Sequence, residues 1–261
     1  MCRWLAYLGA ETYLDRLLFE PKYSLVQQSL AARKSVCTTQ GDGFGLGWYG
    51  DHADPGLYRE ALPAWNDRNL RSLARQLKAR LFFAHVRAST GTDTARSNCH
   101  PFAHDQYLFM HNGQIGGFDR IRRRLEARID DALYPHRLGT TDSETAFYML
   151  FGHGLAHDPI AAFRAMLAEV QVEMAAAGIE DPLRFTAALS DGQRITAVRY
   201  ASDDRPPSLY WREDGPTTIV VSEPLDGEVQ CWNRVPRNHF LVAERGRPVE
   251  LLPVDPVRIA A

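Results

Sequence analysis

Cys2 directly follows Met1, and once Met1 is removed Cys2 alone can supply both a nucleophile and a base. Methionine removal is compatible with a residue as small as cysteine, and it would leave a thiol and a free α-amine on one residue. An α-amine has a pKa of roughly 7.7–8.0, so near neutral pH it can accept the thiol proton. Nucleophile and base would then sit in one amino acid. We therefore take Cys2 as the candidate nucleophile and expect Met1 to be removed.

Further positions along the chain suit acyl transfer to such a nucleophile. Arg87 ends an apolar run, where a planar guanidinium suits bidentate capture of a carboxylate. Asn112 and Gly113 offer a side-chain amide and a backbone N–H, the donor pair of an oxyanion hole. Asp142 falls in the first turn of a predicted helix, where it could bind an ammonium group. Together these residues describe a site for the γ-acyl group of an α-amino acid.

Composition excludes several classes of function. The chain has 261 residues, of which 45% are hydrophobic, and its formal net charge is −2. This balance gives no overall basic field to attract nucleic acid or an anionic membrane. No stretch approaches the roughly 18 uncharged apolar residues of a membrane span. No linker or repeat divides the sequence, so we predict a single domain.

The N-terminus and the cysteines indicate a cytoplasmic protein. Glu11 and Asp15 interrupt the only short apolar run near the start, which is unlike a signal peptide. The cysteines are widely separated and form no CxxC pair, a pattern typical of a reducing compartment. They are Cys2, Cys37, Cys99 and Cys231.

Hydrophobic periodicity predicts the elements that must position these residues. Helices are predicted after Asp67, from Phe118 to Ile129, from the capping-box pattern Thr141–Glu144 to Phe151, and from Asp158 to Met174. Strands are predicted at 81–87, at 107–111, in a hairpin over 185–200 turning at Asp191-Gly192, and at 208–211, 217–222 and 239–243. Strands on both sides of a group of helices favour an α+β fold with antiparallel sheets.

Six segments in this order resemble the class II glutamine amidotransferases, which are N-terminal-nucleophile hydrolases. They are Met1–Arg3, Gly41–Tyr49, His85–Arg87, Asn98–Phe102, His111–Gly113 and Thr141–Glu144. The tail, with Ser222–Leu225 and Trp232–Pro236, resembles the short standalone members, a branch that includes hydrolases of γ-glutamyl compounds in ergothioneine assembly and glutathione breakdown. The resemblance implies a four-layer αββα sandwich and one glutamine amidotransferase domain over residues 2–261.

The resemblance also implies a role for each candidate. Cys2 would attack the γ-carbonyl of glutamine or a γ-glutamyl compound, with its own α-amine as base, through a water molecule. Arg87 would hold the α-carboxylate and Asp142 the α-ammonium, while Asn112 and Gly113 would stabilise the oxyanion. A γ-glutamyl thioester would form and water would release glutamate. No cofactor and no metal are implied.

One departure from the family pattern concerns the wall beside the leaving group. Many synthase-linked members carry a tryptophan and then a threonine–histidine pair after the arginine, whereas this chain has Ala88, Ser89 and Thr90. We include Ser89 and Thr90 among the candidate substrate-binding residues. No synthase segment or P-loop is visible, so ammonia transfer would need a separate synthase partner. Simple hydrolysis is preferred; the alternatives are a glutaminase subunit or a non-catalytic γ-glutamyl-binding or regulatory subunit.

Other patterns have structural explanations. The glycine pattern at 45–50 matches a dinucleotide-binding motif but is followed by a turn, which indicates a strand and tight turn instead. His153 and His157 have metal-like spacing without the glutamate of a metalloprotease motif. Cys99 and His100 are predicted to point to opposite faces of a strand, which argues against a catalytic dyad. A solvated helix face accounts for Arg120, Arg122, Arg123, Arg124 and Arg128.

Overall fold

The computed structural model describes residues 2–32, 39–89 and 91–254. Met1, Cys37 and Thr90 lie outside the described residues, so the predicted removal of Met1 and the proposed role of Thr90 stay predictions.

The described residues form two antiparallel sheets. Sheet A has the order β11-β9-β10-β1-β4-β2-β3, and sheet B has the order β13-β12-β8-β7-β6-β5. The strands of sheet A are β1 (Arg3–Tyr13), β2 (Phe44–Trp48), β3 (Gly56–Glu60), β4 (Lys78–Val86), β9 (Tyr210–Asp214), β10 (Thr217–Val221) and β11 (Asn233–Arg234). Those of sheet B are β5 (Phe102–His104), β6 (Tyr107–Gln114), β7 (Arg184–Ser190), β8 (Arg194–Ala201), β12 (His239–Glu244) and β13 (Glu250–Pro253).

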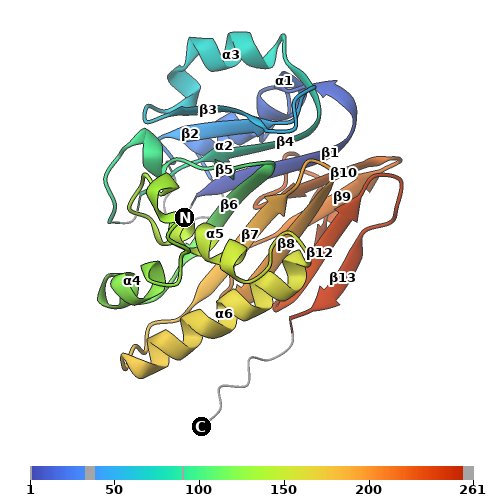
Figure 1. Ribbon diagram of the computed structural model, residues 1–261. Coiled ribbons are helices and arrows are strands. Elements are labelled where there is room, and N and C mark those ends of the chain that lie inside the picture. The colour runs from blue at the N-terminus through green and yellow to red at the C-terminus, as the bar shows by residue number, and fades with distance from the viewer. Residues whose placement is uncertain (1, 33–38, 90, 255–261) are drawn as a thin grey trace.

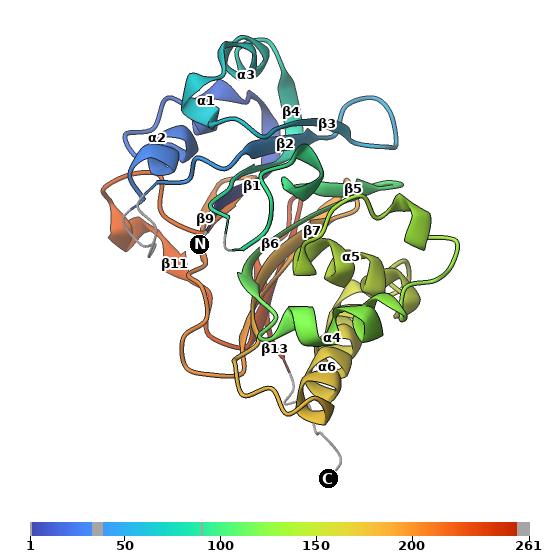
Figure 2. The same cartoon turned by 90° about the vertical axis from the view of Figure 1, so that its left-hand side faces the viewer.

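Helices cover the outer face of each sheet, so the chain has four layers (Figure 1). The helices are α1 (Asp15–Leu18), α2 (Leu25–Leu30), α3 (Arg68–Ala74), α4 (Phe118–Glu126), α5 (Asp142–Gly152) and α6 (Pro159–Ala176). The first three pack on sheet A, and the last three pack on sheet B. Figure 2 shows the two sheets between these helical layers. The predicted αββα sandwich is confirmed.

Alternation along three strands brings the candidate residues to one end of the layer between the sheets. On β1 and β4, the side chains of Trp4 and Phe83 belong to the core between the sheets, and so does Met110 on β6. Because side chains alternate along a strand, the same faces continue to Cys2, to His85 and Arg87, and to Asn112. Strands β1 and β4 run antiparallel with Trp4 opposite His85, so the start of β1 meets the end of β4.

Two glycines of β2 allow another segment to cross the sheet. A Cβ atom on Gly45 would overlap the backbone oxygen of His100, and one on Gly47 would lie 2.8 Å from the ring of Pro101. The turn 100–101 therefore packs directly on the backbone of β2. The glycine pattern at 45–50 has this structural cause, as the preference for a strand at this position predicted.

Most predicted elements are present, with shifted ends. The predicted helices correspond to α3, α4, α5 and α6, although α3 ends at Ala74 and α4 at Glu126. The strand predicted at 208–211 is β9, which begins later at Tyr210. Cys99 and His100 lie in a bend after a short 3-10 turn, so their assignment to a strand is wrong. No helix in the described ranges is long and apolar enough to cross a membrane.

Candidate active site

Cys2 lies at the mouth of the layer between the sheets, just before β1. Its thiol Sγ accepts a hydrogen bond from the backbone N–H of Ala88 at 3.3 Å and lies 3.5 Å from the carbonyl oxygen of the same residue. Burial raises the pKa of the thiol, and the Ala88 N–H opposes this effect. The resting form at neutral pH is therefore the thiol, so attack on a carbonyl requires a base.

Asn112 joins β6 to the residue that carries the thiol. Its side-chain Nδ2 donates a hydrogen bond of 2.8 Å to the backbone carbonyl of Cys2. An amide NH2 has two hydrogens, so a second one is left for an oxyanion. Gly113 follows with a φ of +139°, and a Cβ atom there would overlap the carbonyl oxygen of Arg184. Only glycine fits this backbone beside Asn112.

Arg87 is buried and held by neighbouring loops. Its Nη1 donates to the backbone oxygen of Asp42 at 3.2 Å. Its Nη2 donates to the hydroxyl of Thr92 at 2.6 Å and to that of Ser89 at 3.2 Å. The backbone N–H of Ser89 in turn donates to the Asp42 carboxylate at 2.7 Å. The described contacts of Ser89 thus orient Arg87 and the loop, and its place among the substrate-binding residues stays a prediction.

Asp142 occupies the first turn of α5 and contacts two other parts of the site. Its Oδ2 accepts a 2.8 Å hydrogen bond from the backbone N–H of Ile115, just after β6. Its Oδ1 accepts one from the Ser143 hydroxyl at 3.2 Å. Ser143 Oγ also lies 2.8 Å from His111 Nδ1. The Ser143 hydroxyl therefore links the imidazole of His111 to the carboxylate of Asp142.

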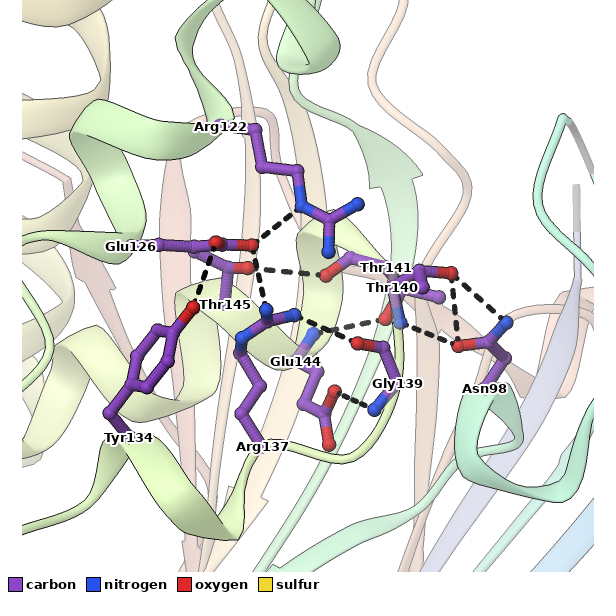
Figure 3. A network of polar contacts seen from close by, with 10 residues as sticks. All are labelled: Asn98, Arg122, Glu126, Tyr134, Arg137, Gly139, Thr140, Thr141, Glu144 and Thr145. Carbon is purple, nitrogen blue, oxygen red and sulfur yellow. Dashed lines mark hydrogen bonds and ion pairs between the residues drawn. The ribbon is translucent and has the colours of Figure 1, made fainter.

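The segment before α5 is held by a network of polar contacts (Figure 3). The Glu144 carboxylate accepts hydrogen bonds from the backbone N–H groups of Leu138 and Gly139, at 3.0 and 2.6 Å. Asn98 Oδ1 accepts one from the N–H of Thr140 at 2.8 Å. Arg137 Nη1 donates to the Gly139 carbonyl at 2.8 Å. These contacts fix the chain on its way to Asp142.

The predicted capping box is half right. The Thr141 side chain accepts a hydrogen bond from the Glu144 N–H at 3.2 Å, as predicted. The Glu144 carboxylate does not complete the box at Thr141, because it bonds to the two N–H groups preceding Thr140 instead. Burial raises the pKa of Glu144, which those N–H groups oppose. The motif thus holds the loop as well as the helix end.

The structure brings together most of the predicted site. Cys2, Arg87, Asn112 and Gly113 lie at one end of the layer between the sheets, and Asp142 joins them through Ile115. Sequence reasoning gave no role to several residues that hold or adjoin them, namely Asp42, His85, Thr92, Asn98, His111 and Ser143. Many of their contacts join distant segments, which no local pattern reveals. His85 is the exception, since alternation from Arg87 places it on the same face.

The motifs with metal or dyad spacing have other partners here. His153 Nε2 lies 2.9 Å from the Glu169 carboxylate. Cys99 Sγ lies near the backbone oxygen of Glu60, at 3.4 Å, whereas the ring of His100 stacks on His85 with centroids 4.3 Å apart. The thiol and imidazole of this pair point to different neighbours. The expected structural role of His100 fits these contacts better than a dyad.

Comparison with known proteins agrees with this geometry. The sequence is 32% identical to the Saccharomyces cerevisiae protein described as "Probable glutamine amidotransferase DUG3", over 94% of this chain and 82% of the relative. It is 30% identical to the gamma-glutamyl-hercynylcysteine sulfoxide hydrolase of Mycolicibacterium smegmatis, over 92% of the chain and 95% of the relative.

Solved structures share the fold. A glutamine aminotransferase class-II domain protein from Silicibacter pomeroyi matches with a TM-score of 0.77 and 34% identity, over 98% of this chain and all of that one. The glutamine phosphoribosylpyrophosphate amidotransferase of Bacillus subtilis matches with a TM-score of 0.66 and 12% identity, over 97% of this chain and 49% of that one. The family model for class-II glutamine amidotransferases matches residues 18–205. The chain therefore belongs to the class II glutamine amidotransferase family.

Proposed function

We propose that this protein, as a single domain over residues 2–261 after loss of Met1, hydrolyses the γ-glutamyl amide bond of a small γ-glutamyl compound. The contact between Asn112 Nδ2 and the Cys2 carbonyl carries this proposal. It sets an amide donor beside the residue that bears the nucleophile, which is the geometry that stabilises a tetrahedral oxyanion.

The chemistry follows from the state of the thiol. Because burial keeps Cys2 protonated, the α-amine must take the thiol proton, directly or through one water, as sulfur bonds to the γ-carbon. The oxyanion then receives the second Nδ2 hydrogen of Asn112 and the Gly113 N–H. Collapse breaks the C–N bond, and the leaving amine takes the proton from the α-ammonium. Water hydrolyses the resulting thioester to glutamate and regenerates the thiol.

Charged groups would orient the glutamyl moiety. Arg87 would pair with the α-carboxylate, which would exchange with the contact that Thr92 makes to Nη2. Asp142, whose carboxylate is fixed by Ile115 and Ser143, would accept the α-ammonium. A buried guanidinium and a fixed carboxylate at the two ends of one amino acid select the γ-glutamyl group over a simple amide.

The relatives support a γ-glutamyl conjugate over free glutamine. One is named as a gamma-glutamyl-hercynylcysteine sulfoxide hydrolase, whereas DUG3 is named as a probable glutamine amidotransferase. At 30–32% identity the leaving group does not carry over. Supply of ammonia from glutamine to a separate synthase is the second candidate, since the family model is that of glutamine amidotransferases.

The test is glutamate release from protein whose methionine-free N-terminus has been verified by intact mass. The panel is L-glutamine, glutathione, and γ-glutamyl amides and dipeptides, with Cys2→Ala as the inactive control. Release from a conjugate, with glutamine poor, supports hydrolysis and identifies the leaving group. Release from glutamine alone favours the ammonia-supplying subunit. No release from any compound contradicts both enzymatic proposals and leaves a γ-glutamyl-binding subunit.

A further inference from the structure

The side-chain oxygen of Asn112 is buried without a hydrogen-bond donor among the described residues. The backbone carbonyl of Cys2 can only accept a hydrogen bond, so the group of Asn112 that faces it must be the NH2. This orientation turns Oδ1 away from Cys2 and into the protein. Asn112 is 2% exposed, and Oδ1 accepts no hydrogen bond of ordinary geometry from the described residues. A buried amide oxygen without a donor is unfavourable, because it has given up its hydrogen bonds to water.

His85 lies beside this oxygen, and its ring lacks a hydrogen-bond acceptor in the described part of the chain. The residue is 1% exposed, and among the described residues neither ring nitrogen has a hydrogen-bond partner of ordinary geometry. Burial, reinforced by the charge of Arg87, lowers the pKa of His85 to about 3, so the ring is neutral and carries one N–H. The Asn112 side chain acts against this shift as a hydrogen-bond acceptor of the ring, which places the two groups in contact.

We propose that His85 is a positioning residue that donates its single N–H to Asn112 Oδ1 and so aims the Asn112 NH2 at the nucleophile. With Oδ1 held by His85 and one Nδ2 hydrogen held by Cys2, the amide plane is fixed at both ends. The remaining Nδ2 hydrogen then points in one fixed direction, toward the place where the oxyanion would form. An oxyanion donor is effective when it is oriented before the charge develops, so the contact would act on the rate of acylation.

Other groups nearby are less suited to this contact, either as the acceptor from His85 or as the donor to Asn112. The His111 backbone carbonyl also lies near the His85 ring, but it raises the pKa of His85 less than the Asn112 side chain does. The His111 ring is on the opposite face of β6, where it reaches Ser143. The ring of His100 packs at a tilt against His85 and edge-on against Phe102, at 4.3 and 4.6 Å between centroids. His85 thus has the position to contact the Asn112 side chain.

The kinetic test rests on the proposed function and compares substitutions of His85. Leucine removes the donor, whereas glutamine keeps an N–H donor in a side chain of similar reach. For His85→Leu we expect kcat to fall at least about tenfold, but less than the roughly 100- to 1,000-fold caused by loss of an oxyanion donor, with little change in KM. His85→Gln should recover most of kcat. The matched control is His100→Leu, a change of the same kind in an equally buried ring, with kcat within about threefold of the parent.

The double variant separates positioning from packing. If His85 acts through Asn112, His85→Leu should have no further effect on kcat in an Asn112→Ala background. Independent, multiplying losses would overturn the proposal, and so would a glutamine variant as slow as the leucine variant.

A spectroscopic readout does not depend on turnover. Imidazole nitrogen NMR should show a neutral His85 with one tautomer, and Asn112→Ala should move its protonated-nitrogen resonance more than any resonance of His100. An unmoved His85 resonance would overturn the proposal even if the protein proves inactive. A moved resonance in a protein that releases no glutamate would preserve the contact and reject the proposed function alone.

Discussion

The ring of His111 lies 2.8 Å from the hydroxyl of Ser143 and thereby connects β6 to the first turn of α5. Strand β6 carries Asn112 and α5 carries Asp142, so this contact sets the distance between the two polar ends of the candidate site. Ser143 also donates to Asp142, and the three side chains form one chain of hydrogen bonds.

Replacing Ser143 should therefore lower the affinity for the substrate. In Ser143→Ala, Asp142 loses a hydrogen-bond donor and His111 loses its hydrogen-bond partner, each contact being worth about 0.5–1.5 kcal/mol. We expect KM for a γ-glutamyl substrate to rise about three- to tenfold, with a smaller effect on kcat. The control is Ser72→Ala on the exposed face of α3. Equal KM values for both variants would contradict the role of Ser143.

Cys2→Ala should abolish turnover and leave the fold intact. The thiol contacts only Ala88 by hydrogen bonding among the described residues, so its loss removes little from the core. Thermal unfolding of the variant should stay within about 3 °C of the parent, as for a loss below 1 kcal/mol. Glutamate release measured with the same substrate would be undetectable. Appreciable release would remove Cys2 as the nucleophile.

Arg87→Lys should raise KM strongly. The ammonium cannot make the two-pronged contact with a carboxylate and also cannot span Asp42 and Thr92. A loss of about 2–3 kcal/mol in binding corresponds to a 30- to 150-fold rise in KM. Arg80→Lys is the control, because Arg80 is an exposed arginine of β4, the strand that ends just before Arg87. An unchanged KM for every γ-glutamyl compound would place substrate recognition elsewhere.

Gly45→Ala should destabilise the protein through backbone overlap. The added Cβ would meet the His100 carbonyl, so β2 or the turn 100–101 must move. We expect a loss of about 1–3 kcal/mol in the free energy of unfolding, as found when a packed core is overfilled. Gly50→Ala adds the same atom where nothing lies within 4 Å. Urea unfolding of the pair should show the loss only at position 45.

Stability should fall steeply in mild acid. Burial lowers the pKa of His85 to about 3, and it also lowers the pKa of His100 and of His111. Below about pH 6.5 the unfolded chain binds more protons at these rings than the folded chain does, so the folded state loses stability as pH falls. His85 alone adds a slope of about 1.4 kcal/mol per pH unit between roughly pH 6 and 5, because its pKa in the folded chain is about 3.

Urea unfolding at pH 7, 6 and 5 measures this slope. His100→Phe should make the slope shallower, and His52→Gln, at an exposed position, is the control. A stability that is flat from pH 7 to pH 5 would show that the rings are protonated in the folded protein.

Much of the fold was accessible from sequence because its helices have clear periods and caps. Strand β1 was not predicted: its first seven residues, Arg3–Gly9, are buried on both faces, so no alternation of polar and apolar residues marks it. Strand β2 is rich in glycine for reasons that only the turn 100–101 explains. These signals depend on contacts between distant segments.

The candidate site divides in the same way. Residues with chemical signatures, such as Cys2, Arg87 and Asn112, were predictable from type and position. Their supports were not, because Thr92, Ser143 and Glu144 act through hydrogen bonds to a loop or helix whose position depends on the whole fold. The capping box shows where prediction stops. The hydrogen bond between the Thr141 side chain and the Glu144 N–H was predicted, but the partners of the Glu144 carboxylate were not.

The central place of β1 has a consequence for dynamics. Chain ends usually fray and exchange their amide hydrogens quickly, but β1 pairs with β10 on one side and with β4 on the other within a few residues of Cys2. The amides of Leu5 to Leu8 should therefore exchange with solvent deuterium as slowly as those in the interior of β7. Under the proposed function, these pairings hold the nucleophile in a fixed position, so binding must bring the γ-carbonyl of the substrate to Cys2.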